Sequence, residues 1–157
     1  MRLVIVFLLF LATVSNAGTA NNHFKNRDVA FSMYWGGCND SAADQTQFMS
    51  NSSNCATNET STETTGQVVG IAGTLTTLSC ASRTAPTLDT VWTFQVRTGF
   101  TTNVTGAVCS IAAGSTTCSA TFSQAVTAAT LITVSNVETG TALDGPEHFC
   151  TVSGTVP

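Results

Sequence analysis

Beyond residue 27, hydrophobic and polar residues alternate along the chain. Large apolar side chains stand at every second position of residues 28–36, namely at Val29, Phe31, Met33 and Trp35. A period of two places these four side chains on one face of an extended strand. Two glycines then end the pattern, so the sequence predicts a strand over 28–36 with a single apolar face.

Similar short segments recur from residue 67 onward and are separated by turn residues. In one of them, Trp92, Phe94 and Val96 share a face with Thr90, and the residues between them take the other face. Short alternating runs of this kind, bounded by Gly, Pro, Ser and Asp, are typical of β-strands. The predicted strands lie within residues 67–82, 90–98, 107–111, 117–123, 131–137 and 148–156.

The connections between these strands are predicted from small and turn-forming residues. Ala113-Gly114-Ser115 lies between residues 107–111 and 117–123, which predicts a hairpin of these two strands. Residues 125–130 are rich in alanine and could form a short helical turn, but their threonines argue against a longer helix. Short strands with no convincing helix predict an all-β sandwich or barrel.

A polar segment, residues 38–66, separates the first predicted strand from the others. It contains many Ser, Thr and Asn residues. A connection of this length in a compact domain is usually functional, glycosylated or held by a disulfide. We expect a solvated loop closed by a Cys38–Cys55 disulfide, and its Ser and Thr side chains over residues 50–65 also suit O-glycosylation.

The start of the chain has the pattern of a secretory signal peptide. Arg2 precedes an apolar run over residues 3–14, and small residues occupy the positions before a cleavage site after Ala17. The run is too short to cross a bilayer, which takes about 20 apolar residues in a helix. Cleavage after Ala20 is an alternative. The expected organisation is a signal peptide at 1–17, a flexible arm at 18–27 and one β-sandwich domain at 28–157 of an extracellular protein.

All six cysteines follow the predicted signal peptide, and an even number in an exported chain predicts three disulfides. Sequence alone does not choose among the possible pairings, but one pair would flank the predicted hairpin and another would bracket the polar segment. The favoured pairs are Cys109–Cys118, Cys38–Cys55 and Cys80–Cys150. Loop-closure entropy gives them about 3, 3 and 4 kcal/mol respectively. Because no CxxC pair occurs, we do not expect a zinc site.

Four N-x-S/T sequons are candidate N-glycosylation sites in an exported protein. They are Asn39, Asn51, Asn58 and Asn103. The first three fall inside the polar segment 38–66, which is expected to be accessible. Covalent glycans are therefore the one non-protein group that the sequence predicts.

Charge and composition exclude several functions. Five Lys and Arg against nine Asp and Glu give a net charge of −4, and charged residues make up only 9% of the chain, against about 25% in an average domain. Without a basic patch there is no electrostatic basis for binding nucleic acid or an anionic membrane surface. We expect neither partner, and no membrane insertion.

Residues that could carry chemistry are few. Neither His23 nor His148 lies in a hydrolase motif, and no GxSxG sequence occurs, so the sequence predicts no catalytic residues and no enzymatic activity. Asp144, Glu147 and His148 form a cluster that could hold a cation. Calcium sites use more oxygen ligands at fixed spacing, so a solvated turn is the favoured interpretation, and we expect no metal ion or cofactor.

Several motifs resemble a small jelly-roll-like β-sandwich domain of exported and phage-borne surface and tail-fibre proteins. The family combines a GTLxxL strand, a TAP turn, a WTFxVR strand and a hairpin between two cysteines. The matching segments are 73–78, 84–86, 92–97 and 109–118. The resemblance covers residues 67–157 and gives the strand at 28–36 the place of the family's first strand. It implies a jelly-roll-like fold and a structural role in an extracellular fibre or surface layer, with no catalytic residues to transfer.

Together these features predict a glycosylated subunit of an extracellular filament or surface fibre whose partner is another copy of itself. The strand at 28–36 could leave its own domain and complete the sheet of a neighbour, with its four apolar side chains in the neighbour's core. A head-to-tail contact of this kind does not close on itself and yields a filament. The alternative, left open by the sequence, is that this strand pairs within its own subunit in a monomer or trimer.

A secreted carbohydrate-binding, lectin-like module is the alternative function, with glycans as the partner. Aromatic side chains stack on sugars, and Tyr34, Trp35 and Trp92 are the candidates. Each lies in an alternating strand, where an aromatic side chain is usually part of the core. Exposed aromatic residues on one sheet face would favour this alternative.

Overall fold

The computed structural model describes residues 28–38, 46–50, 66–99, 101–140 and 147–157. These residues form nine β-strands and no helix. The strands are β1 (Val29–Cys38), β2 (Thr46–Phe48), β3 (Gln67–Val68), β4 (Gly73–Ser82), β5 (Val91–Thr98), β6 (Thr102–Ile111), β7 (Thr117–Val126), β8 (Leu131–Thr139) and β9 (Glu147–Val156). No helix in the described part of the chain is long and apolar enough to cross a membrane.

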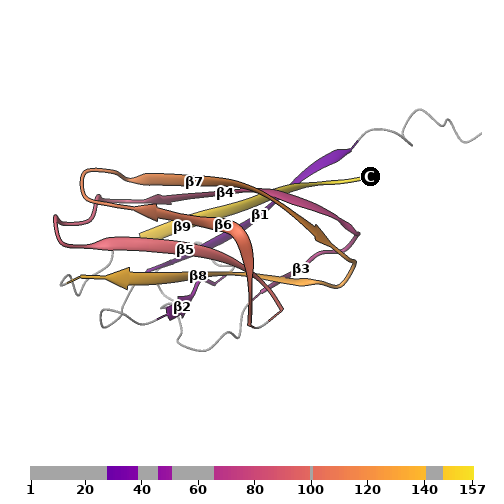
Figure 1. The fold of residues 1–157 in the computed structure, drawn as a ribbon, viewed down its shortest axis with the longest axis horizontal. Coiled ribbons are helices and arrows are strands. Elements are labelled where there is room, and N and C mark those ends of the chain that lie inside the picture. Colours follow the sequence, from indigo (N-terminus) through magenta and orange to yellow (C-terminus); the bar gives the residue numbers. More distant parts are fainter. Residues whose placement is uncertain (1–27, 39–45, 51–65, 100, 141–146) are drawn as a thin grey trace, which may run out of the picture.

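Two antiparallel sheets pack face to face (Figure 1). One has the order β1-β9-β4-β7. The other has the order β2-β8-β5-β6, with the short β3 also pairing with β8. With β3 set aside, these two orders are those of an eight-stranded jelly roll. Each successive strand crosses to the other sheet, except that β6 stays beside β5. The predicted all-β, jelly-roll-like sandwich is confirmed.

The core lies between the two sheets and is built from the alternating faces that the sequence predicts. In β5, Trp92, Phe94 and Val96 point inward and are buried, as is Thr90 just before the strand. Apolar side chains of β4, β6, β8 and β9 complete the core: Leu75, Leu78, Ile111, Ile132, Val134 and Val152. Although Glu138 and His148 are also buried, most of the interior side chains are apolar, so burial of apolar area is the main stabilising term of the fold.

The predicted hairpin at residues 107–123 is wrong in its pairing. β6 and β7 are joined by a tight turn in which the Ser115 N–H donates to the Ala112 carbonyl at 3.0 Å and Gly114 adopts a φ of 80°. However, β6 pairs with β5, whereas β7 pairs with β4. The turn therefore carries the chain from one sheet to the other, because each strand completes the ladder of a different sheet.

Two further expectations are corrected by the structure. The segment 38–66 contains β2, because Phe48 and Met49 are buried against the sandwich and carry their short segment into the second sheet. Instead of a helical turn, the residues after β7 form a tight turn in which Thr130 N–H donates to the Thr127 carbonyl at 3.2 Å and Ala129 has a φ of 67°. Contacts distant in sequence accompany both changes: the burial of Phe48 and Met49 in the first, and in the second a hydrogen bond from the Ala129 N–H to the Val69 carbonyl at 2.8 Å.

Two of the three predicted disulfides are present. Cys80–Cys150 joins β4 to β9 within one sheet, and Cys109–Cys118 joins β6 to β7 and hence one sheet to the other. Disulfides of this kind form and persist in oxidising environments. Cys55, the predicted partner of Cys38, lies outside the described residues, as do the predicted signal peptide at 1–17 and the arm at 18–27.

Candidate functional site

β1 is an edge strand of the sandwich. It pairs with β9 along its whole length, from Val29 opposite Val156 to Cys38 opposite Glu147. This is the pairing within one subunit that the sequence left open as the alternative to strand donation. In Figure 1 the first residues of β1 lie beside the C-terminus at one end of the sandwich.

The outer edge of β1 is closed over only part of its length. The Gly36 N–H donates to the Ser50 carbonyl at 2.9 Å, and the Ser50 hydroxyl donates to the Gly36 carbonyl at 3.0 Å. The Gln67 side-chain amide donates to the Tyr34 carbonyl. No described strand pairs with the outer edge over residues 29–33. Unpaired N–H and C=O groups of this kind can bind another strand.

The four apolar side chains of β1 enter the core to different depths. Trp35 is fully buried and Met33 nearly so, Phe31 is half-buried, and Val29 is 58% exposed. The Phe31 ring lies over Gly154, where an added Cβ would stand 2.9 Å from the ring's Cζ atom. The predicted apolar face is therefore confirmed, and its hold on the core weakens toward the start of the strand.

An apolar cleft of about 300 Å³ lies beside the open part of this edge. Its lining is Phe31, Met33, Val68, Val69, Gly70, Ile71 and Val156. Val68 and Ile71 are 61% and 63% exposed, as exposed as Val29 on the strand itself. Exposed apolar side chains clustered next to an unpaired strand edge are typical of a surface that binds another protein segment.

The outer face of the β1-β9-β4-β7 sheet forms a second concave surface. Strand register places Tyr34, Thr151, Ser79 and Ser119 in one row across the four strands, and Gly36, Phe149, Ala81 and Thr117 in the next. A hollow of about 550 Å³ lies over the second, third and fourth positions of these rows. Gly36 and Ala81 flank Phe149, so the aromatic ring has almost no neighbouring side chain in its own row.

An aromatic pair and an ion pair border this hollow. The rings of Tyr34 and Phe149 are stacked, with their centroids 6.2 Å apart. Arg83 Nη1 lies 3.8 Å from Glu147 Oε2. Burial, and second the nearby Glu147 carboxylate, raise the pKa of Tyr34 above its ordinary value of 10.0. The phenol therefore keeps its proton at neutral pH and can donate a hydrogen bond.

The three aromatic candidates for sugar stacking separate in the structure. Trp35 and Trp92 are core residues with 0% and 2% exposure, whereas Tyr34 is 37% exposed on the outer sheet face. Phe149, the partner of Tyr34, was not predicted from the sequence. The signal was the alternation around Cys150, because an inward cysteine in a strand places the residue before it on the outer face.

The cluster predicted as a possible cation site is not assembled. Glu147 and His148 are consecutive residues of β9, so they face opposite sides of the sheet. His148 is fully buried and packs edge-on against Trp92 and Phe94, with centroid distances of 4.7 and 5.3 Å. Burial lowers its pKa to about 4. Asp144 lies outside the described residues.

Three cysteine sulfurs come close together where the two disulfides meet. The Sγ atoms of Cys80, Cys109 and Cys118 lie within 4.8 Å of one another. Cys80 stands directly opposite both Cys118 and Cys150 in neighbouring strands. Each of these sulfurs is already bonded to another sulfur, whereas a metal ligand would have to be a thiolate.

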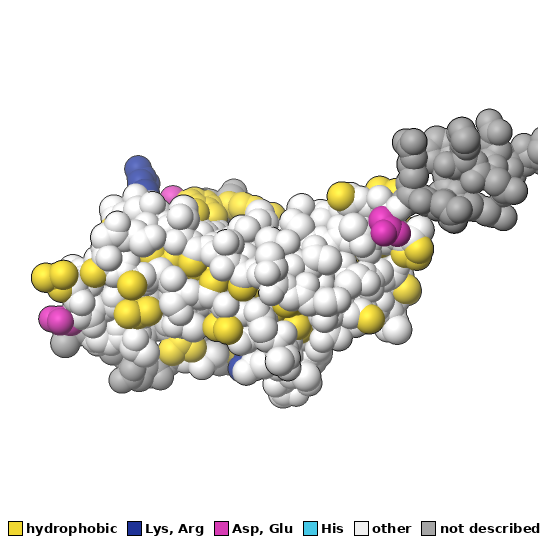
Figure 2. All heavy atoms as spheres, turned by 45° about the horizontal axis from the view of Figure 1, so that its top comes forward, with side chains coloured by type: hydrophobic (Ala, Val, Ile, Leu, Met, Phe, Trp, Pro, Cys, Tyr) yellow, Lys and Arg dark blue, Asp and Glu magenta, His cyan; other side chains and the backbone are white. Residues whose placement is uncertain are grey.

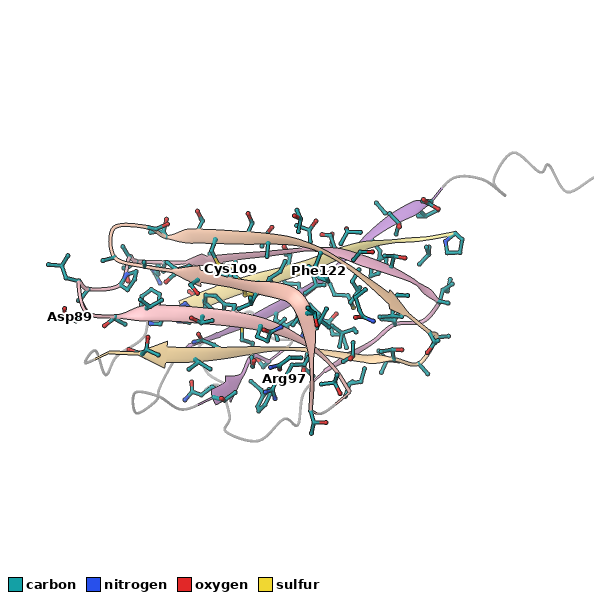
Figure 3. The ribbon with its side chains drawn as sticks, viewed as in Figure 1. Asp89, Arg97, Cys109 and Phe122 are labelled. Carbon is teal, nitrogen blue, oxygen red and sulfur yellow. A yellow bond between two sulfur atoms is a disulfide. The ribbon has the colours of Figure 1, made fainter. Side chains whose placement is uncertain are left out.

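Asn103 is the one predicted glycosylation site among the described residues. It lies exposed near the start of β6, the edge strand of the second sheet. Arg97, labelled in Figure 3, donates from Nε to the Asn103 side-chain oxygen at 2.9 Å. The Arg97 guanidinium also stands over the Phe48 ring, 5.1 Å from the centroid. The other three sequons, at Asn39, Asn51 and Asn58, lie outside the described residues.

Comparison of the chain with protein-family models and with curated proteins finds no match.

Proposed function

We propose that the protein is a structural subunit of an extracellular filament or surface fibre, assembled head-to-tail by exchange of β1 between neighbouring subunits. The observation that carries the proposal is the combination at one edge: the first described strand, an outer edge that no described strand pairs with over residues 29–33, and an adjacent apolar cleft. In this proposal the protein is secreted and carries N-linked glycans, Asn103 among the sites. The two disulfides agree with the oxidising setting that secretion would provide.

Exchange of β1 conserves the contacts that hold it. The ladder with β9, the ring of Phe31 over Gly154 and the buried Trp35 can all be formed with a neighbour's β9. Because these contacts are the same in both arrangements, the balance depends on the connection after β1 and on any extra contact between subunits. The exposed Val29, Val68 and Ile71 supply apolar area for such a contact.

A designed disulfide distinguishes exchange from pairing within one chain. Ser32 and Ser153 are direct cross-strand partners on β1 and β9, and their hydroxyl oxygens are 2.8 Å apart. In the S32C/S153C variant, the new disulfide will join different chains if β1 is exchanged. We expect a ladder of covalent oligomers on a non-reducing gel, which collapses to monomer when reductant is added.

The single variants S32C and S153C are the matched controls, and neither should give the ladder. When the two are mixed before assembly, a covalent heterodimer should form. A double variant that runs only as monomer would show that β1 stays in its own subunit. A dimer with no larger species would show reciprocal swapping, which does not build a filament. Electron microscopy of the native material at neutral pH gives an independent check, because dispersed particles of one or three subunits would contradict the proposal.

A further inference from the structure

The hollow on the outer face of the β1-β9-β4-β7 sheet differs in chemistry from the apolar cleft beside β1. Apart from Phe149 and Ala81, its outward side chains are hydroxyls: Ser79, Thr117, Ser119 and Thr151. We propose that this hollow, bordered by the stacked Tyr34 and Phe149, binds a neutral saccharide. This site would be a second function, separate from assembly through β1.

The aromatic floor is the first element of the site. Phe149 is flanked in its row by Gly36 and Ala81, which add no side chain or only a methyl group beside the ring. Tyr34 stacks on the Phe149 ring from the adjacent row. Aromatic rings present a flat apolar surface. The C–H face of a pyranose ring has the matching shape and polarity.

The hydroxyl groups are the second element. Each Ser or Thr hydroxyl both donates and accepts hydrogen bonds, as does each hydroxyl of a sugar. Among the described residues, the Thr151 hydroxyl has one long contact, 3.5 Å, to the Ser79 carbonyl. Ser79, Ser119 and Thr117 are exposed to solvent. These hydroxyls are therefore accessible to a ligand that presents alternating donors and acceptors.

Charge is the third element and selects a neutral ligand. No charged side chain among the described residues lines the hollow. At its border, Arg83 Nη1 lies 3.8 Å from Glu147 Oε2, so the charges of the two side chains largely cancel. The Tyr34 phenol stays protonated and neutral. The carboxylate of a uronic acid or sialic acid would therefore meet no unpaired cationic side chain among the described residues of the hollow. Figure 2 likewise shows a visible face on which charged side chains are sparse.

Size and polarity favour a saccharide over a second copy of the chain. The volume of about 550 Å³ falls within the range of clefts that hold drug-sized ligands, about 300–1,000 Å³, which suits a short oligosaccharide. The core of a protein interface is apolar and rich in large side chains. Among the described residues, that character belongs to the cleft beside β1, whereas this hollow offers Phe149 as its single large apolar group.

An NMR titration tests the proposal with defined probes. Uniformly labelled, non-glycosylated protein is titrated with maltohexaose, cellohexaose, chitohexaose, xylohexaose and mannohexaose, and with hexagalacturonic acid as the charged comparison. We expect at least one neutral hexasaccharide to give saturable shifts of the Ser79, Ala81 and Phe149 amides. Hexagalacturonic acid should bind more weakly than that sugar or not at all.

Substitutions locate the site. Y34A and F149A should each weaken binding by about tenfold, the factor that corresponds to about 1.4 kcal/mol. V108A, which trims a 43% exposed side chain on the other sheet, should leave binding unchanged. Tyr34 is exposed, so Y34A keeps the test valid if F149A fails to fold.

Three outcomes would overturn the proposal. In the first, none of the neutral hexasaccharides shifts the amides of this face. In the second, Y34A and F149A bind the sugar as well as the unmodified protein does. In the third, the same amides shift with protein concentration alone, which would assign the face to contact with a second copy. The disulfide ladder from S32C/S153C is independent of all three, so failure of one proposal leaves the other standing.

Discussion

The two long sides of the sandwich are closed in different ways. On the β6–β7 side, the Cys109–Cys118 disulfide joins the sheets covalently, and Figure 3 shows Cys109 and Phe122 on these neighbouring strands. On the β1–β2 side, the described closing contacts are hydrogen bonds, from Gly36 and Ser50 to each other and from Gln67 to Tyr34. The β6–β7 side is thus the fixed side. The β1–β2 side is the open side, because it can open without breaking a covalent bond among the described residues.

On the fixed side, a side chain compensates for a shift in the β5–β6 register. The β5–β6 register shifts between Gln95 and Arg97, which leaves carbonyls of β6 out of the ladder. The Gln95 side-chain amide donates to the Val104 and Ala107 carbonyls at 2.9 and 3.1 Å.

Opening free energies can differ within one domain. The contrast therefore predicts that amides of β1 exchange hydrogen faster than those of β6 and β7.

The largest expected effect comes from truncating Trp35, the most deeply buried side chain of β1 on the open side. Trp35→Ala removes a fully buried side chain from β1, and such truncations cost about 3–5 kcal/mol. The free energy of unfolding, measured by denaturant titration, should fall by that amount, and β1 amides should lose their protection. Leu88→Ala, at a position 92% exposed, is the control. A loss below about 1 kcal/mol would show that β1 is not part of the cooperative core.

The next largest effect is expected from acid, which should lower the free energy of unfolding by protonating a histidine in the interior. Burial lowers the pKa of His148 from its ordinary 6.5 to about 4, so the unfolded chain binds a proton before the folded one does. The stability present above pH 6.5 is lost as the pH falls to about 4, by about 3 kcal/mol. His148→Phe should remove this loss in urea titrations across that pH range. An unchanged slope in the variant would assign the loss to other groups.

Cutting the covalent link should make the fixed side resemble the open one. Cys109→Ser with Cys118→Ser removes a crosslink with a sequence separation of 9, which stabilises the fold by about 3 kcal/mol according to loop-closure entropy. Hydrogen exchange in β6 and β7 should then rise toward the rate in β1. If β6 and β7 stay as protected as before, the disulfide is not what distinguishes the two sides.

The smallest expected effect concerns the hydrogen bond from Gln67 to β1 on the open side. Gln67→Ala removes the donor to the Tyr34 carbonyl, and a single hydrogen bond contributes about 1 kcal/mol. Stability should fall by about that amount, and exchange of the neighbouring β1 amides should rise more than exchange elsewhere. Gln124→Ala, whose side chain bonds only to its neighbour Ala125 at 2.8 Å, is a matched control. Equal effects from both would refute a special role for Gln67.

The contrast between the two sides also marks how far the sequence could predict the fold. Alternation identified β1 and β5 because each carries a run of large apolar residues on one face. The Cys109–Cys118 pair followed from its short spacing, but not its position between sheets, because strand pairing is a long-range choice. β2 was missed because three residues carry too little periodicity, although Phe48 and Met49 were visible as apolar residues in a polar segment.

The candidate site was predictable only in part for the same reason. Tyr34 was a candidate from its residue type, but its exposure follows from the position of β1 at the sheet edge. Phe149 became a candidate only when the register placed it between Gly36 and Ala81. These neighbours are far apart in sequence, so no local pattern could bring them together.

The position of β9 between β1 and β4 has a consequence for the order of events during synthesis. Ser32 and Ser153 touch across the first ladder although they are 121 residues apart in the chain. β1 therefore emerges from the ribosome, and in an exported protein crosses the membrane, long before its partner strand exists. Contacts of such high sequence separation form slowly. During that interval the apolar face of β1 is free to bind a chaperone or the completed sheet of an earlier copy.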